Sequence, residues 1–396
     1  MYSEDDLNSA VAAGALSAEA AASFRNHMTR VRELPRGSEE NFRLINSFND
    51  IFVAIGIVIL LVAVGAIGQA IAGILMPAPI YPFENWAFST GYPPSYDEQM
   101  AAWRAGREAS EALATCLSGL LVAVTAWPLA EFFTRKRRMA LPSIILLLSF
   151  VGGVFFTLFG AGAALGLSGE ELVGAIAIVL SGVVACAGAY MHWRRFQVPI
   201  TIAAAVGVVV ISLLIALLAL LQIQPDAPAF LIPVLMSGLA IFTFAMRWDI
   251  SDRDRITRRS DVAFWLHLLA APMIAHPVFA LFGVTDGDDL GVGAAIGVLA
   301  IYIGFGLVAL AIDRRALLVS ALAYVLFALT FLFQEFGAVE LGFALTALVI
   351  GSALLSLSAF WQPIRHKVVA ALPENIQAKL PATTDTPLSA SAASPV

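Results

Sequence analysis

Charged side chains are scarce in this sequence, and their scarcity excludes an ordinary soluble domain. Asp, Glu, Lys and Arg make up 13% of the 396 residues, against about 25% in a typical soluble domain. Hydrophobic residues make up 59%, and the mean hydropathy is +0.84. A chain this apolar has too few polar side chains to cover its hydrophobic ones in water. The composition therefore predicts a protein whose partner is the lipid bilayer.

Cysteines and metal-binding patterns are also nearly absent. The two cysteines, Cys116 and Cys186, lie in apolar stretches, where they serve as small hydrophobic side chains. No Cys and His residues have the spacing of metal ligands, so we expect neither a metal site nor a disulfide framework. No basic tract indicates a nucleic-acid partner. No nucleophile stands beside a base, so we assign no catalytic residue and leave any cofactor unknown.

Ten long apolar stretches dominate what the sequence does contain. A helix needs about 20 apolar residues to cross a hydrocarbon core of about 30 Å. Because lipid cannot hydrogen-bond the backbone, and the stretches are continuous rather than alternating, they are predicted to be helices and not barrel strands. The fold class is therefore an all-α polytopic membrane protein. The stretches are 51–75, 112–133, 140–161, 172–191, 198–222, 229–246, 262–284, 291–312, 316–334 and 341–361.

Lysine and arginine alternate along the chain in a way that predicts its orientation. With the N-terminus inside, only Arg104 and Arg107 of the 23 Lys and Arg residues fall in external connections. Cytoplasmic connections carry an excess of Lys and Arg in membrane proteins. We therefore expect both termini to be cytoplasmic and the protein to lie in a bacterial inner membrane.

Three regions follow from this topology. Residues 1–48 are expected to form a cytoplasmic helical hairpin, broken at Gly14 and with its second helix capped by Ser17, and then a juxtamembrane helix. Residues 49–362 hold the ten spans, with 77–110 as an external loop whose part from Tyr96 can run as a helix into the second span. Residues 363–396 form a cytoplasmic tail, expected to be disordered from about 382.

The seventh stretch contains the most unusual motif, "FWLHLLAAPMIAHPVF" at 264–279. His267 and His276 face opposite sides of an ideal helix. Pro272 and Pro277 each remove a backbone donor and free a carbonyl, which predicts a broken, interior helix. These four residues are our candidates for a binding site or proton relay. The alternatives are an interfacial position for His267 and a structural hydrogen bond to a neighbouring helix for His276.

Glu131, in the second stretch, is the fifth candidate. It follows Pro128 much as His276 follows Pro272, and the two stretches correspond if the ten spans form two inverted halves of five. Matched Pro-interrupted helices are a known indication of a transporter site. The alternative is an ion pair with Arg135 one turn later.

Glycine spacing also predicts a contact in the eighth stretch. Gly293 and Gly297 form a GxxxG pattern there, which favours close helix packing.

Three segments together resemble a known family. They are "DLNSAVAAGALSAEAA", "ENFRLINSFNDIFVAIGIVIL" and the motif of the seventh stretch. They resemble uncharacterised bacterial multi-pass inner-membrane proteins with an N-terminal cytoplasmic helical hairpin. The resemblance implies the location and the architecture, and it assigns no chemistry to any residue.

Two functions are compatible with these observations. The first is a small-solute transporter with its site at the Pro-containing seventh helix. The alternative is a non-catalytic membrane scaffold, sensor or envelope-assembly protein that binds a cytoplasmic protein partner through its N-terminal hairpin. A homo-oligomer is compatible with either function, and a membrane enzyme is the least favoured.

Overall fold

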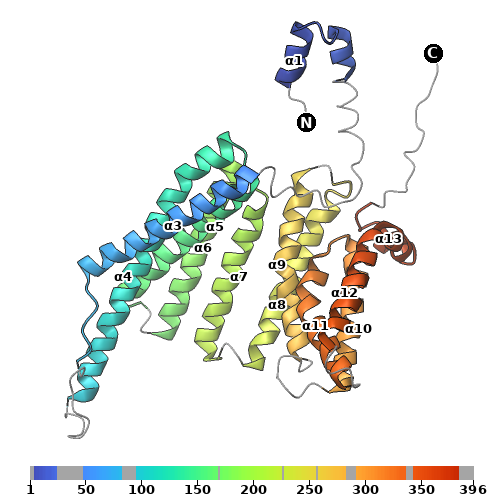
Figure 1. Ribbon diagram of the computed structural model, residues 1–396. Coiled ribbons are helices and arrows are strands. Elements are labelled where there is room, and N and C mark those ends of the chain that lie inside the picture. The colour runs from blue at the N-terminus through green and yellow to red at the C-terminus, as the bar shows by residue number, and fades with distance from the viewer. Residues whose placement is uncertain are drawn as a thin grey trace.

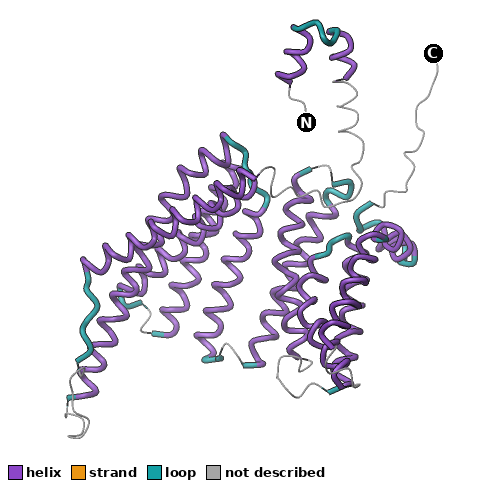
Figure 2. Tube along the Cα trace, viewed as in Figure 1, coloured by secondary structure: helices purple, strands orange, loops and turns teal. Residues whose placement is uncertain are grey.

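The computed structural model describes residues 4–24, 48–82, 95–167, 170–224, 227–255, 257–281, 291–335 and 342–382. Within these ranges every regular element is a helix (Figure 1, Figure 2). The expected all-α fold is confirmed.

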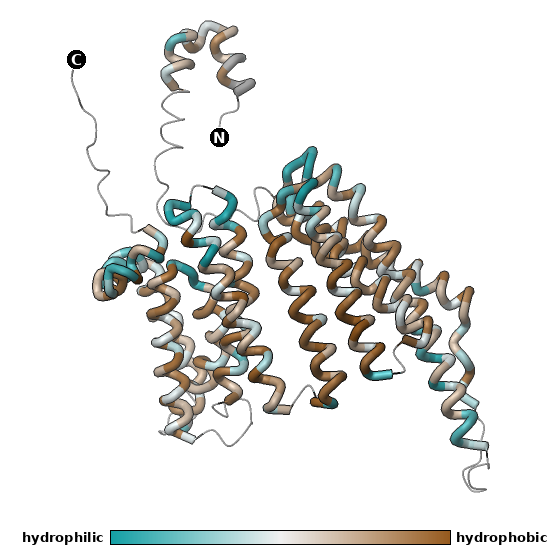
Figure 3. Tube along the Cα trace, turned by 180° about the vertical axis from the view of Figure 1, so that it is seen from behind, coloured by the Kyte–Doolittle hydropathy of each residue, from teal (hydrophilic) through white to brown (hydrophobic). Residues whose placement is uncertain are grey.

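Ten helices of the described ranges are long and apolar enough to cross a membrane, which confirms the number of spans. Figure 3 shows how apolar residues cover their middle parts. Two carry short continuations, a π-helix η2 (Glu131–Lys136) after α4 and a 3₁₀ turn η3 (Pro228–Phe230) before α8. The ten are α3 (Phe48–Leu75), α4 (Tyr96–Ala130), α5 (Ala140–Ala164), α6 (Glu171–Phe196), α7 (Ile200–Leu221), α8 (Leu231–Ile250), α9 (Arg258–Leu281), α10 (Val292–Ile312), α11 (Ala316–Glu335) and α12 (Gly342–Ala359).

In the first half of the bundle, glycines bring α4 and α5 together. A Cβ on Gly153 would lie 2.7 Å from the Gly119 carbonyl oxygen, and one on Gly160 would lie 2.5 Å from the Cys116 nitrogen. Only a residue without a side chain permits such backbone contact, which is how helices associate without a hydrophobic driving force in lipid. By contrast, a Cβ on Gly293 meets nothing within 4 Å. The close packing predicted at Gly293 is therefore wrong, because that face of α10 points away from its neighbours.

In the second half, α9 is the central helix. Of its most apolar window 56% is buried, against at most 28% for any other membrane-length helix. It contacts α7 through Leu269 at Gly207 and α8 through Met273 at Gly238. It contacts α11 through a hydrogen bond between His276 and Tyr324. The predicted interior position of this helix is confirmed.

The two prolines of α9 do not break it. The helix runs without interruption from Arg258 to Leu281, with Pro272 and Pro277 inside it. The expectation of a broken helix is thus wrong. Each proline removes only one backbone hydrogen bond, and neighbouring helices pack against the altered turns and keep them helical.

The two halves do not share one packing order. In the first half α4 packs along α3 and α5, whereas its counterpart α9 packs along α8 and α11. An inverted repeat places equivalent helices against equivalent neighbours. The packing gives no support to the repeat.

Hydrophilic residues gather at one end of the bundle, the upper end in Figure 3, where they are teal, and in Figure 1. Here α5, α7, α9 and α11 begin, and the chain continues from α12 into α13 (Trp361–Ala370) and α14 (Glu374–Gln377). We call this end the arginine-rich face. Its basic residues are Arg135, Lys136, Arg137, Arg138, Arg194, Arg195, Arg247, Arg253, Arg255, Arg258, Arg259, Arg314, Arg315, Arg365 and Lys367.

The N-terminal region forms a small helical pair of its own. α1 (Glu4–Ala12) ends before Gly14, which has a φ of +69°, and a second helix covers 18–24. The Ala20 nitrogen donates to Ser17 Oγ at 3.1 Å, and Ala21 is fully buried. The predicted break and helix cap are confirmed. The predicted juxtamembrane helix and the disorder expected beyond 382 lie outside the described residues.

Candidate functional site

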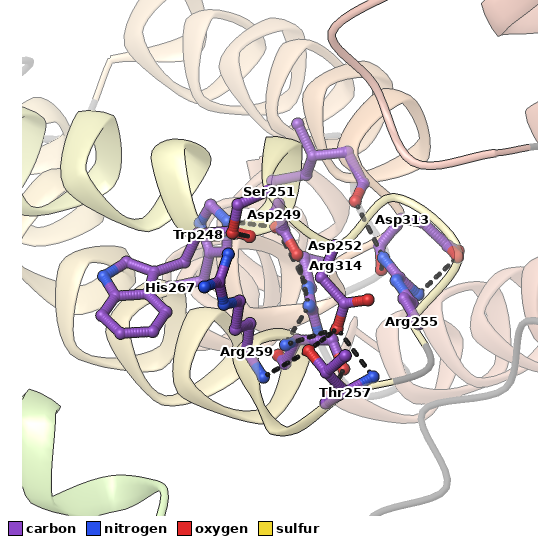
Figure 4. Close-up of polar contacts among 12 residues, drawn as sticks. Trp248, Asp249, Ser251, Asp252, Arg255, Thr257, Arg259, His267, Asp313 and Arg314 are labelled. Carbon is purple, nitrogen blue, oxygen red and sulfur yellow. Dashed lines mark hydrogen bonds and ion pairs between the residues drawn. The ribbon is translucent and has the colours of Figure 1, made fainter.

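Charged residues are buried together where α8, α9, the α10–α11 turn and α13 meet on the arginine-rich face (Figure 4). Burying charge is expensive unless each ion is paired, so such a group in a membrane protein marks a functional candidate. We call it the buried charge cluster. Its members are Asp249, Arg255, His267, Asp313, Arg314, Trp361 and Arg365.

Asp249 is the centre of one half of the cluster. It lies in the last turn of α8, and only 1% of its surface is exposed. Arg314 Nη2 donates to Asp249 Oδ1 at 2.6 Å and to the Ser260 carbonyl at 2.9 Å. His267 Nε2 lies 2.9 Å from Asp249 Oδ2. Arg314 Nε also donates to Asp249 Oδ2, at 3.5 Å. The carboxylate therefore binds a guanidinium, most closely through Oδ1, and an imidazole through Oδ2.

His267 reaches this carboxylate from the first half of α9. A carboxylate only accepts hydrogen bonds, so His267 donates through Nε2. The ring stands edge-on to Phe242 at 5.0 Å, and 2% of the residue is exposed. Its Nδ1 is buried and has no hydrogen-bond partner among the described residues. His267 is thus a fully enclosed imidazole with one nitrogen still able to take a proton.

Asp313 is the centre of the other half. It follows α10 directly and has a φ of +56°, a left-handed conformation that Asp tolerates better than most residues. This turn places Asp313 and Arg314 side by side with their side chains in opposite parts of the cluster (Figure 4). Asp313 accepts from Arg255 Nη1 at 2.8 Å and from Trp361 Nε1 at 2.6 Å. The α10–α11 turn therefore joins both halves of the cluster.

Arg365, on α13, connects the cluster to the end of the described chain. It is fully buried, with Nε 3.7 Å from Asp313 Oδ1, and it donates to the Pro381 and Ala382 carbonyls at 2.7 and 3.2 Å. Burial lowers the pKa of this guanidinium, and the Asp313 carboxylate acts in the opposite direction. Leu380, 5% exposed, packs with Ile312 and Val369. The segment after α14 thus closes one side of the cluster.

The sequence candidates are not brought together into one site. His267 belongs to the buried charge cluster. His276 lies five residues before the end of α9, towards the other end of the bundle, where its exposed ring is hydrogen-bonded through Nδ1 to the Tyr324 hydroxyl at 2.7 Å. Pro277 is buried beside it, whereas Pro272 is exposed. Because the helix between them stays regular, the two histidines lie in different environments and do not share a site.

Glu131 lies elsewhere, at the start of η2. It pairs with Arg135 at 3.3 Å, as the alternative interpretation expected, and also with Arg195 of α6 at 2.6 Å. Neither of these two partners belongs to α9. Glu131 therefore links η2 to α6 rather than contributing to the charge cluster.

One histidine outside the candidates is also fully enclosed. His192 is 0% exposed in α6, surrounded by Trp127, Phe150 and Phe196, and neither ring nitrogen has a partner in the described part of the chain. No three His, Cys, Asp or Glu side chains of the described residues come close enough to hold a metal ion.

Sequence reasoning missed most of the charge cluster. It treated Asp249, Arg314 and Arg365 as residues of polar connections, because the apolar stretches end before them. A usable signal was present: Asp249 and Asp313 are acidic residues on the arginine-rich side, where the charge bias of membrane proteins requires none. Acidic residues at such positions indicate ion pairs.

The fold and the cluster together define the class of the protein. No family model matches the chain, and neither the curated proteins nor the solved structures contain a match to it. The ten apolar helices make it a multi-pass membrane protein. The buried charge cluster is its most distinctive described site.

Proposed function

We propose that the chain is a small-solute transporter of a bacterial inner membrane, with α9 as the central helix and His267 as a proton-binding residue. The observation that carries this proposal is the buried contact between His267 and Asp249, 2.9 Å long, on the most buried helix of the bundle. Ionisable residues inside membrane proteins mark proton or substrate pathways by default.

The charge balance in the Asp249 half of the cluster supports a role for protonation. Asp249, Arg314 and a neutral His267 sum to zero charge, with every carboxylate oxygen engaged. Uptake of a proton at His267 Nδ1 creates an imidazolium close to Arg314, and the two cations compete for one carboxylate. Such a change can loosen the contact of α8 and α9 with the α10–α11 turn and so couple proton binding to helix movement.

An uptake screen in cells tests the proposal. Solutes whose uptake falls when the gene is deleted are identified first, and the full-length protein and its variants are then supplied to the deleted strain. We expect His267→Gln to lower uptake of such a solute. His192→Phe should leave it unchanged, because neither ring nitrogen of His192 has a hydrogen-bond partner among the described residues. Wild-type uptake by His267→Gln at equal protein level contradicts the proposal, as does the absence of any affected solute.

The same screen decides whether His276 takes part. His276→Ala removes the hydrogen bond to Tyr324 from a side chain that is already exposed. Lower uptake with His276→Ala but not with Tyr324→Phe would place the imidazole itself, rather than the hydrogen bond, on the solute pathway. Equal uptake with both variants would limit its role to packing.

We also propose that the arginine-rich face is cytoplasmic, which puts both termini inside the cell. The support is the collection of Lys and Arg at one end of the bundle. Reporter fusions test this orientation: a tag after position 255 should read as cytoplasmic and one after 290 as external. The reverse pattern refutes it.

The second candidate is a scaffold or sensor that binds a cytoplasmic partner through the N-terminal helices. The observation that favours it is the capped and internally packed helical pair with Ser17 and Ala21. Crosslinking in cells with and without residues 1–45 tests it. A partner lost on truncation supports this function, whereas unchanged crosslinks oppose it; crosslinks between copies of the chain would reveal a homo-oligomer.

A further inference from the structure

A second polar feature lies on the arginine-rich face of the first half, away from the charge cluster. It is a cavity of about 480 Å³ between η2, the start of α5, the α6–α7 turn and the start of α9. This volume falls in the range of small-molecule sites. Its polar lining consists mainly of Thr134, Arg135, Arg138, Arg195, Arg258 and Asp261.

Four arginines from separate elements converge on the cavity, against one aspartate. Glu131, just outside, engages Arg195 through Nε and Arg135 through Nη1. Arg258 donates to the Gln197 carbonyl at 3.3 Å. Arg138 makes no hydrogen bond or ion pair with the described residues. The guanidinium groups therefore keep most of their donors available for an anion.

Local backbone geometry orients some of these side chains toward the cavity. Glu131–Lys136 form a π-helix that begins three residues after Pro128, and π-helical turns occur often at functional sites. The wider turn places Thr134 against the cavity. Arg138 has a φ of +54°, a conformation that costs about 1–2 kcal/mol for a non-glycine residue. This turn holds Arg138 at the edge of the cavity.

Thr134 supplies an independent indication of a ligand. Only 9% of this residue is exposed, it lines the cavity, and its hydroxyl has no hydrogen-bond partner among the described residues. A threonine inside a helical turn can bond to the carbonyl one turn earlier, and Thr157 does so with Gly153 at 2.6 Å. Thr134 instead leaves this hydroxyl without a partner among the described residues, at the wall of a cationic cavity.

Apart from Ser143 and Gln197, the remaining lining is apolar. Ile144, Phe196, Val198 and Ile200 form this part of the wall. A molecule with a phosphate group and an apolar or glycerol portion matches both surfaces. Arginine forks bind phosphate oxygens in pairs, and basic pockets between membrane helices on the cytoplasmic side are suited to phospholipid headgroups.

We propose that this cavity is a phosphate-binding site, occupied either by the headgroup of an anionic phospholipid or by a soluble phosphate ester. Arg138 and Arg258 bind the phosphate oxygens, Thr134 donates its hydroxyl to one of them, and Glu131 keeps Arg135 and Arg195 in place. The proposal is independent of the transport function.

The experiment uses the full-length protein and two kinds of ligand. In the first arm, the protein is placed in nanodiscs of phosphatidylcholine alone or with a minority of phosphatidylglycerol, and lipid retention after detergent extraction is measured by native mass spectrometry. In the second arm, glycerol phosphate or inorganic phosphate is titrated in zwitterionic detergent, and thermal unfolding is followed.

Variants distinguish binding at this cavity from a general attraction of anions to the basic surface. Arg138→Gln should weaken binding of the relevant ligand roughly tenfold or more, and Thr134→Val about three- to tenfold, as expected for a charged and a neutral hydrogen bond. Arg137→Gln is the matched control, because Arg137 precedes Arg138 but lies over the Phe132 ring at 5.5 Å instead of lining the cavity. It should bind like the wild type.

Each outcome decides the proposal. Retention of phosphatidylglycerol that Arg138→Gln abolishes and Arg137→Gln preserves supports the site with a lipid source. The same variant pattern seen only with glycerol phosphate or inorganic phosphate supports it with a soluble source. Equal losses in Arg137→Gln and Arg138→Gln, or no response to any of these anions, overturns it.

Discussion

Removal of Arg314 from the buried charge cluster gives the sharpest test of its energetics. Arg314 is 4% exposed and donates two hydrogen bonds to Asp249 and one to the Ser260 carbonyl. In Arg314→Met the side chain keeps much of its length but loses the charge. The Asp249 carboxylate, 1% exposed, then stays buried with His267 as its remaining partner.

Two routes give a similar magnitude for this loss. Unit charges about 4 Å apart interact with about 4 kcal/mol at an effective dielectric constant of about 20. Breaking a buried ion pair by removing one partner costs about 3–5 kcal/mol in other proteins. We therefore expect Arg314→Met to lower the free energy of unfolding by about 3–5 kcal/mol.

A second variant isolates the charge. In the double variant Asp249→Asn with Arg314→Met, both ions are gone, and it should be less destabilised than the sum of the two single variants by about 2–3 kcal/mol. Arg315→Met is the control, since Arg315 is exposed and lies 4.7 Å from the Trp361 ring centre. Its loss should cost no more than about 1 kcal/mol.

The assay is reversible unfolding in mixed micelles with increasing sodium dodecyl sulfate, followed by tryptophan fluorescence and circular dichroism. The reasoning is refuted if Arg314→Met costs less than about 1 kcal/mol, or if the two single effects simply add. Either result would mean that Asp249 is solvated or neutral rather than held as a buried anion.

Three further predictions use the same unfolding assay. Gly153→Ala should destabilise the protein by about 1–3 kcal/mol, because the added Cβ meets the α4 backbone. Gly152→Ala has open space for its Cβ and should stabilise the protein by about 0.5–1 kcal/mol. Equal effects would exclude close α4–α5 packing. His192→Phe should stabilise by about 1 kcal/mol or more, since it removes an unpartnered buried imidazole, and a loss of stability would indicate a hidden hydrogen bond. Truncation after Leu372 removes both carbonyl acceptors of Arg365 and should lower the free energy of unfolding by about 2–5 kcal/mol. The same truncation should cost less in a chain that already carries Arg365→Met. An unaffected truncated chain would show that the final segment does not stabilise the cluster.

The sequence by itself determined the class of the protein and the number of its spans. Both depend on composition and on the length of the apolar stretches. A segment in lipid must hydrogen-bond its own backbone groups and present an apolar surface, so a long apolar stretch predicts a spanning helix. The interior position of α9 was also predictable, since its histidines and prolines need protein partners. Local signals predicted the N-terminal turn at Gly14 and the cap at Ser17.

Tertiary structure alone decided which polar residues meet. Asp249 and Arg314 are 65 positions apart, and the span prediction left both in connections. Their contact depends on how closely α8, α9 and the α10–α11 turn pack together. Neither the helical period nor the spacing of residues in the sequence predicts this packing. The same holds for Arg195 of α6, which pairs with Glu131 of η2. It holds also for Thr134, whose hydroxyl in the π-helical turn has no partner among the described residues. Apolar patterns specify where a helix crosses the membrane. Many charged side chains at one membrane face could pair, but only one arrangement also fills the space between the helices. Helix packing therefore decides the partners of each buried charge.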